Sequence, residues 1–103
     1  MFSLVLTTVK NRSEAKRLSE KLVSEKLAAC VSALPGVSST YRWRGKLERA
    51  GEVLLSIKTS NKKLDRLIPR IKELHSYEVP EILVIPIKRG APEYLKWIDE
   101  SLS

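Results

Sequence analysis

The sequence is poor in residues that mark several classes of protein. Its single cysteine, Cys30, cannot form an internal disulfide, which argues against a disulfide-stapled scaffold and favours a reducing cytoplasm. No apolar run approaches the roughly 18–20 residues that span a bilayer. The chain has no glutamine and only two asparagines, while lysine, arginine and glutamate are abundant. This bias is typical of a heat-adapted, thermostable protein.

The N-terminus also lacks the marks of an export signal. Residues 1–8 have neither a basic leading region nor a small-residue cleavage site, so we expect them to begin a strand. The 103 residues, of which 43% are hydrophobic, suffice for one core. We therefore expect a single soluble domain over residues 1–103.

The net charge of +7 suggests a nucleic-acid partner at first sight. The basic residues are, however, spread along two predicted helices and interleaved with glutamate and aspartate. Such spacing is typical of solvated helix faces with ion pairs one turn apart. The charge alone therefore predicts no nucleic-acid site.

Hydrophobic periodicity predicts four strands and three helices. A strand over Phe2–Val9 precedes a helix over Arg12–Leu27, which Asn11 and Glu14 cap and which buries Ala15, Leu18, Leu22 and Val23. A strand from Ala28 to Leu34 is interrupted by Pro35-Gly36, resumes over Val37–Trp43, and turns at Arg44-Gly45-Lys46 into a partner over Lys46–Ser60. Asn61 is expected to cap a second helix that buries Leu64, Leu67, Ile68, Ile71 and Leu74 and carries Pro69 on its outer side. A strand over Val79–Ile87 and a helix starting at Pro92, with Tyr94, Leu95, Ile98 and Leu102 inward, complete the chain.

The order β-α-β-β-α-β predicts an α+β fold, the ferredoxin-like split β-α-β sandwich with a long hairpin and an added C-terminal helix. Its first and third strands should lie in the centre of the sheet. The prolines agree, because Pro35, Pro80 and Pro86 all fall in the two predicted edge strands, where a missing N–H is tolerated.

The sheet face opposite the helices should be polar in a monomer, but here it is predicted to be apolar. We assign Val5 and Leu54 of the central strands to it, and the last predicted strand is apolar on both sides. Exposing such a face would leave a patch larger than monomers usually carry. The long hairpin also ends in Tyr41 and Trp43, aromatic anchors typical of interfaces. We therefore expect copies of the chain to associate.

Several local motifs occur in a characteristic order. They are Glu25–Val31, Pro35–Val37, Tyr41–Glu48, Glu52–Thr59, Glu73–Glu81 and Tyr94–Ile98. Together they resemble the CutA family of divalent-cation-tolerance proteins over nearly the whole chain. The resemblance implies a cytoplasmic homotrimer similar in plan to the PII signalling proteins, without settled enzymatic activity. Copper(II) or another divalent cation is the implied ligand, no cofactor is required, and an unidentified partner protein is an open option.

The resemblance also implies a set of site residues. It places a polar and aromatic group near a cleft between subunits, where it either binds a small ligand or fixes the subunit register. The group comprises Tyr41, Trp43, Lys46, Glu48, Tyr77, Glu78 and Glu81. Some positions depart from the family pattern. Ser76 replaces a usual proline and Ala91 a usual polar residue, while Thr7 and Leu74 stand where copper-binding members carry cysteine and histidine.

Two residues are candidate metal ligands. His75, the only histidine, could ligate a transition metal, especially if symmetry brings three copies together. Alternatively it occupies a helix C-terminus, where the dipole favours a cation. Cys30 could be a ligand, or it could serve as a small buried hydrophobe between Ala29 and Val31.

Two other functions share the predicted topology. A nucleic-acid-binding module would stack bases on aromatic residues of the central strands, but Val53–Thr59 has none and Phe2 is the only one in the first strand. A small phosphatase would need a glycine-containing anion loop after the first strand, and Thr7–Arg12 contains no glycine. No nucleophile–base pair is evident either, so we predict that the protein is not an enzyme.

Overall fold

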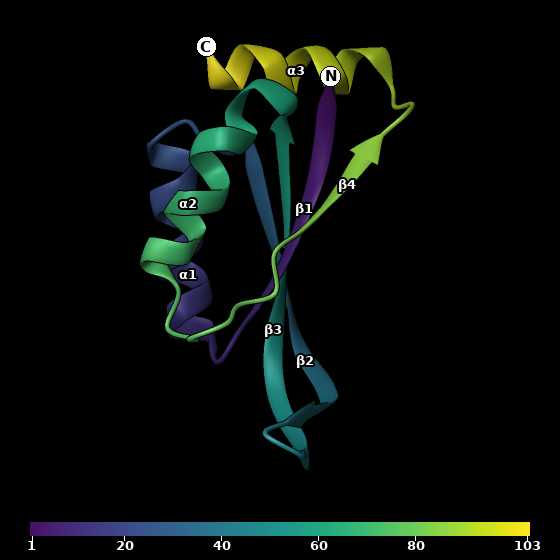
Figure 1. Ribbon diagram of the computed structural model, residues 1–103. Helices are drawn as coiled ribbons and strands as arrows, with labels where there is room; N and C mark the ends of the chain where they lie inside the picture. The colour runs from purple at the N-terminus through teal and green to yellow at the C-terminus, as the bar shows by residue number, and fades with distance from the viewer.

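Four strands and three helices follow one another along the chain, as Figure 1 shows for the computed structural model, which describes residues 1–103. A short 3₁₀ turn, Asn61–Lys63, leads into the second helix. The elements are β1 (Phe2–Val9), α1 (Arg12–Ser24), β2 (Cys30–Trp43), β3 (Lys46–Ser60), α2 (Leu64–Leu74), β4 (Leu83–Ile87) and α3 (Pro92–Leu102).

The strands form one antiparallel sheet in the order β2-β3-β1-β4. β1 and β3 are therefore central and β2 and β4 are edges, which confirms the predicted ferredoxin-like topology. Pro35 lies in β2 and Pro86 in β4, so neither removes a hydrogen bond from the middle of the sheet. The last strand is shorter than predicted, because residues 79–82 make no ladder and form instead a segment that crosses to the edge.

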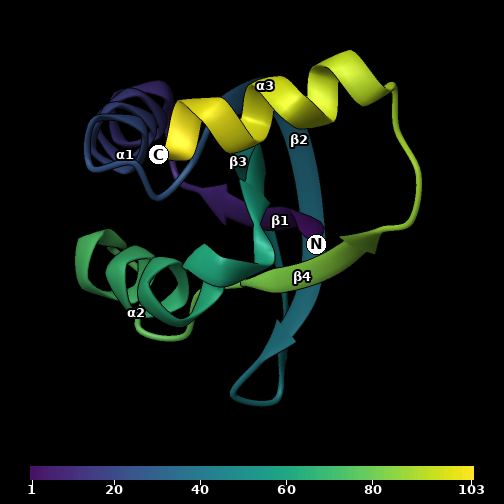
Figure 2. The ribbon, with the colours of Figure 1, turned by 90° about the horizontal axis from the view of Figure 1, so that it is seen from above.

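α1 and α2 cover the same face of the sheet (Figures 1 and 2). Between them and the sheet lies the main core, which includes Leu18, Leu22, Leu55, Leu67 and Ile71. Val5 also points into this core and is fully buried, so its assignment to the opposite face was wrong. Side chains of β1 alternate in the opposite sense to the prediction, so Phe2, Leu4 and Leu6 face away from α1 and α2.

The helix ends show why two boundaries differ from prediction. Asn11 caps α1 as expected, since its side chain accepts from the backbone N–H of Glu14. The helix ends at Ser24, not Leu27, because Lys26 takes the left-handed conformation with φ 58° and the chain turns back. Val23, which was expected to pack inward, lies outside the buried face of Ala15, Leu18 and Leu22 and is 41% exposed.

Asn61 does not cap α2. It belongs to the 3₁₀ turn, and its side-chain oxygen accepts a hydrogen bond from the hydroxyl of Ser3. In α3 a similar correction applies to Tyr94, which is 44% exposed, whereas Ile98 and Leu102 are buried against Ala29. Pro69 lies on the exposed side of α2, as predicted.

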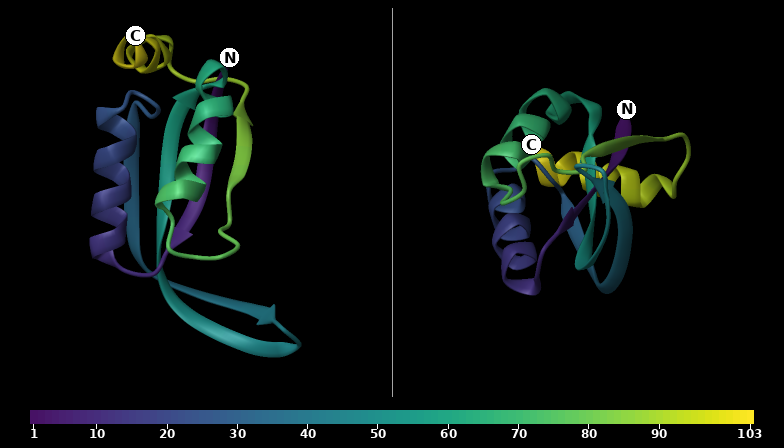
Figure 3. Two further views of the ribbon diagram at one scale, coloured as in Figure 1. Left: turned by 60° about the vertical axis from the view of Figure 1, so that its left-hand side comes forward. Right: turned by 60° about the horizontal axis from the view of Figure 1, so that its bottom comes forward.

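The β2–β3 hairpin continues well beyond the helices, as the left view of Figure 3 shows. It gives the molecule an elongated shape of 44 × 25 × 24 Å. A break in register between Leu34 and Val37 separates this outer part from the body of the sheet. Gly36 occupies the resulting bulge with φ 78°, a conformation that favours glycine.

The sheet face away from α1 and α2 remains open, and it carries exposed apolar side chains beside the polar Ser32, Ser56 and Lys58. The pairing places Leu34 beside Leu54, Leu6 beside Leu83 and Leu4 beside Ile85 on this face. Leu34 is 59% and Leu83 55% exposed. α3 does not cover them, because it lies across the end of the sheet and packs on Phe2 and Ala29 (Figure 2). No helix is long and apolar enough to cross a membrane.

Candidate functional site: an acidic and aromatic pocket beside the hairpin

The segment between α2 and β4 is fastened to the sheet at its first residue. α2 ends at Leu74, and the capping residue that follows, His75, is extended and buried. One ring nitrogen of His75, Nδ1, accepts the backbone N–H of Tyr77 at 3.1 Å. The other, Nε2, is 2.8 Å from the carbonyl oxygen of Thr8 and donates to it. Both nitrogens thus have backbone partners, so a metal ion on this ring would have to displace one of them.

Glu14 holds the next residue of the segment. This carboxylate is only 3% exposed and accepts the backbone N–H of Ser76 at 2.8 Å and its hydroxyl at 3.0 Å. It also accepts the backbone N–H of Lys10 at 3.2 Å. Burial opposes ionisation, but these hydrogen bonds outweigh it and hold the pKa of Glu14 below its usual value. A charged Glu14 therefore joins α1, the end of β1 and the segment after α2.

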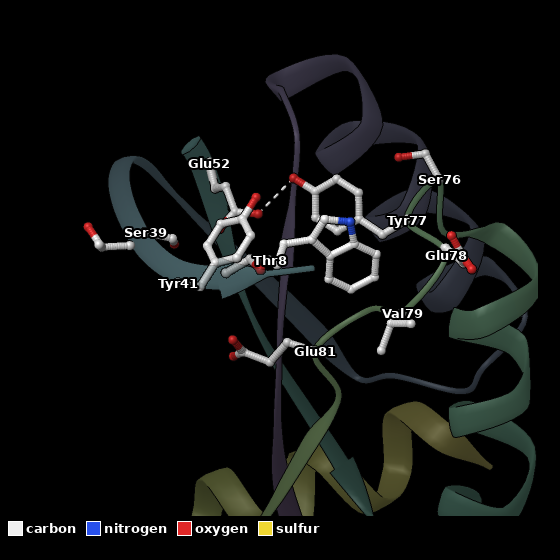
Figure 4. A pocket seen from close by; sticks show the side chains of 11 residues that line it. Thr8, Ser39, Tyr41, Glu52, Ser76, Tyr77, Glu78, Val79 and Glu81 are labelled. Carbon is white, nitrogen blue, oxygen red and sulfur yellow. Dashed lines mark hydrogen bonds between the residues drawn. The ribbon is translucent and has the colours of Figure 1, made fainter. Parts of the chain in front are cut away.

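Tyr77 then reaches across to the hairpin. Its hydroxyl donates to Glu52 Oε2 at 2.7 Å, the bond drawn in Figure 4. Burial, and secondly this hydrogen bond, raise the pKa of the Tyr77 phenol, so it stays neutral and remains a donor. Glu52 lies on the open side of the sheet by its position in β3, yet it is only 8% exposed.

A pocket of about 640 Å³ lies between the hairpin and this segment. Figure 4 shows Glu52 and Tyr41 reaching it from the hairpin, and Tyr77, Glu78 and Glu81 from the segment after α2. The lining contains three carboxylates and three aromatic rings but no lysine or arginine. It consists of Thr8, Ser39, Thr40, Tyr41, Trp43, Glu52, Ser76, Tyr77, Glu78, Val79 and Glu81.

Most of the predicted cleft residues meet here within one chain. Tyr41, Trp43, Tyr77, Glu78 and Glu81 line the pocket. Lys46 and Glu48 pair with Trp43 and Tyr41 across the hairpin but are not part of the lining. Sequence reasoning missed Glu52. The available signal was an isolated carboxylate directly before the buried residue Val53, at the point where the hairpin leaves the sheet.

Arg44 stands at the turn of the hairpin, outside the lining. Its guanidinium lies 5.3 Å from the ring centre of Trp43 and 3.6 Å from the carboxylate of Glu78. Both side chains of this ion pair are more than 70% exposed, so it contributes little stability.

Cys30 lies far from this pocket, near α3. It is half-buried and pairs with Lys58, which in turn lies beside Leu4 on β1, four residues before Thr8. That offset corresponds to roughly 13 Å along the strand. Burial and the neighbouring Cys30 thiol raise the pKa of Tyr94. His75 and Cys30 do not meet in one chain, and no three His, Cys, Asp or Glu side chains gather closely enough to hold a metal ion.

Comparisons with known proteins agree on one family. The profile of the CutA1 divalent ion tolerance protein matches residues 3–101. The divalent-cation tolerance protein CutA of Thermus thermophilus is 44% identical over 101 residues, which cover 98% of this chain and 98% of that protein. The chloroplastic protein CutA 1 of Oryza sativa is 46% identical over 98 residues, or 95% of this chain. The chain spans about half the length of such plant relatives, 55% in this case.

Solved structures agree in fold. The divalent cation tolerance protein of Thermus thermophilus superposes with a TM-score of 0.96 at 43% identity, with both chains fully covered. A protein of Archaeoglobus fulgidus, described as a periplasmic divalent cation tolerance protein, gives 0.96 at 39% identity, also over both full chains. The family is described by ion tolerance and not by a catalysed reaction. From the profile match and the full-length bacterial relative, this chain belongs to the CutA1 divalent ion tolerance family.

Proposed function

We propose that the protein works as a non-catalytic homotrimer that binds or responds to divalent metal ions, copper(II) foremost, or to a small ligand at clefts between subunits. The observation that carries the proposal is the pocket of Tyr77 and Glu52, whose wall is an arm that extends past the body of the subunit. Family membership supports the link to divalent cations. Relatives bear names that refer to divalent-cation tolerance.

Association of copies is supported by the open sheet face. Leu34, Leu83 and Ile85 are each 42% or more exposed on that face. Covering them would remove apolar surface from water, which is worth about 25 cal/mol per Å². A closed ring of copies shelters this face without leaving a free edge. Three copies are the proposed number because the sequence resembles a trimeric family.

A cytoplasmic location is part of the proposal. It is supported by the single cysteine, since a protein without disulfides suits a reducing compartment. Relatives are described as chloroplastic and as periplasmic, so the family is found in more than one compartment. The nucleic-acid alternative gains no support, because the open face of β1 and β3 has no aromatic ring except Phe2.

Native mass spectrometry with and without copper(II) or zinc tests this function. We expect a trimer in every case, and metal uptake per trimer that falls in the His75→Ala protein if His75 is a ligand. Tyr77→Phe is a suitable companion, because it loosens the same segment and leaves the imidazole in place. Unchanged uptake in His75→Ala removes His75 from the metal site. A monomer at micromolar concentration refutes the clefts between subunits.

A further inference from the structure

Glu52 is a buried carboxylate without a basic partner. The residue is 8% exposed, and its Oε2 accepts the Tyr77 hydroxyl. Its other oxygen makes no hydrogen bond within the chain but is open to solvent, because Thr7 Oγ1 is the one buried side-chain atom left without a partner. No lysine or arginine lies within ion-pair distance of Glu52. A carboxylate so largely covered by protein gains from a cation that pairs with it. The unpaired oxygen belongs to a pocket-lining residue, so a cation in the pocket would complete the pairing.

The walls of the pocket suit a cation that has an apolar surface. Tyr41, Trp43 and Tyr77 contribute three aromatic rings, whose faces attract positive charge. The chain already makes one such contact, since Arg44 lies over Trp43. Glu81 supplies a second carboxylate without an ion-pair partner, whereas Glu78 is engaged by Arg44.

The size of the pocket distinguishes an organic cation from a bare metal ion. Its volume of about 640 Å³ lies within the range of small-molecule sites, whereas a water molecule fills only about 30 Å³. The three carboxylates do not converge closely enough to form a metal site. Metal ions also gain little from aromatic walls, because they prefer oxygen, nitrogen or sulfur ligands.

We propose that this pocket binds a small organic cation with an ammonium group, which Glu52 pairs with and the rings of Tyr41 and Trp43 enclose. This proposal depends on the proposed function in one respect, namely that the pocket is a ligand site. It adds the chemical class of the small ligand. Glu81 adds charge at the pocket's outer side, and Tyr77 orients Glu52 through its hydrogen bond.

Choline and its uncharged carbon analogue, 3,3-dimethylbutan-1-ol, have the same shape and differ in charge. Comparing their binding therefore tests whether the pocket recognises positive charge. In a Trp97→Phe background the fluorescence reports Trp43 alone, because the chain has only two tryptophans. We expect choline to change this fluorescence saturably and the alcohol to bind at least about ten-fold more weakly. Glu52→Gln should weaken choline binding by about ten-fold or more, and Glu81→Gln, at an exposed position, by about three-fold. Glu20→Gln on the exposed side of α1 is the matched control and should bind like the parent protein.

The possible outcomes separate this inference from the proposed function. Equal binding of choline and the alcohol, or undiminished choline binding in both Glu52→Gln and Glu81→Gln, overturns the inference. If Glu52→Gln fails to fold by circular dichroism, the Glu81→Gln result and the choline–alcohol comparison still decide. Uptake of copper(II) or zinc without choline binding refutes the organic cation and leaves the metal role standing. Choline binding without any metal uptake refutes the metal role and leaves the organic cation standing.

Discussion

Ser76 and Glu14 show how one departure from the family pattern is accommodated. A proline at position 76 would lack the N–H that Glu14 accepts, whereas Ser76 offers both an N–H and a hydroxyl. Together with the N–H of Lys10, the carboxylate therefore satisfies three donors around its buried site. Such a set of charge-assisted bonds stabilises the ionised form.

Glu14→Gln is expected to lower the free energy of unfolding by about 1–3 kcal/mol at pH 7, since an amide nitrogen would face a backbone donor. Because the folded pKa of Glu14 lies below its usual value of 4.5, its ionised form stabilises the fold above that pH. The contribution is lost as the pH falls through the folded pKa. The difference between parent and variant should therefore shrink in urea titrations from about pH 7 to about pH 3. Glu20→Gln, at an exposed position of the same helix, should show no such difference, and a constant gap at all pH values contradicts the account.

Individual contacts of the pocket were only partly predictable from sequence. Tyr41, Trp43, Tyr77, Glu78 and Glu81 were selected through a family resemblance, which carries no geometry. Glu52 was missed because its burial depends on a segment 25 residues later that folds over it. The partners of His75 are backbone atoms of Thr8 and Tyr77, and side-chain patterns reveal nothing about backbone partners.

At the scale of elements, the bulge of the hairpin depends on a left-handed backbone conformation. Gly36 has φ 78° and lies at the register break, and nothing lies within 4 Å of the place where a side chain would begin. A substitution there meets backbone strain alone, without a clash. Gly51, on the partner strand, has an ordinary φ and equally open surroundings.

Gly36→Ala should therefore destabilise the protein by about 1–2 kcal/mol, the cost of the left-handed conformation for an alanine. Gly51→Ala is the matched control and should be neutral or stabilising by about 0.4–1 kcal/mol, because it restricts the unfolded chain. Thermal unfolding of the two proteins measures the difference. Equal midpoints would show that the bulge relaxes and that Gly36 has no special role.

The order and type of the helices and strands followed well from the sequence. The face on which each strand residue lies and the residues at which the helices end did not. The 3.6-residue period identified α1 and α2, and the β-α-β-β-α-β order identified the edge strands, with which Pro35 and Pro86 agree. Val5 was assigned to the wrong face because β1 is apolar on both sides, as Leu4, Val5 and Leu6 show. The end of α1 was placed too late because Lys26 adopts a left-handed conformation that its residue type does not signal.

At the scale of the whole molecule, residues on the open sheet face can be replaced to test the proposed association without disturbing the core of the subunit. Leu34 contributes to this face and is 59% exposed, so replacing it removes little from the core of one subunit. Val23 is 41% exposed on α1, on the opposite side of the molecule. Replacing each residue with lysine therefore tests the open sheet face against the surface of α1.

Leu34→Lys should shift the proposed trimer toward smaller species, since a charge would have to be buried between copies. A weakening of association by at least about ten-fold is expected in sedimentation equilibrium, with the circular dichroism of the subunit preserved. Val23→Lys should sediment like the parent. If Leu34→Lys also sediments like the parent, the open face is not where the copies meet.

The projecting arm has a consequence for the pocket. Beyond the bulge, β2 and β3 form a two-stranded ribbon without a helix over it, and such ribbons are only marginally stable in water. Ser39, Tyr41 and Trp43 all lie on this ribbon, so we expect one wall of the pocket to fray in an isolated subunit. Neighbouring copies that press on the arm would make it rigid and raise the fraction of binding-competent pockets. Dilution would then weaken ligand binding without altering a single contact inside the pocket.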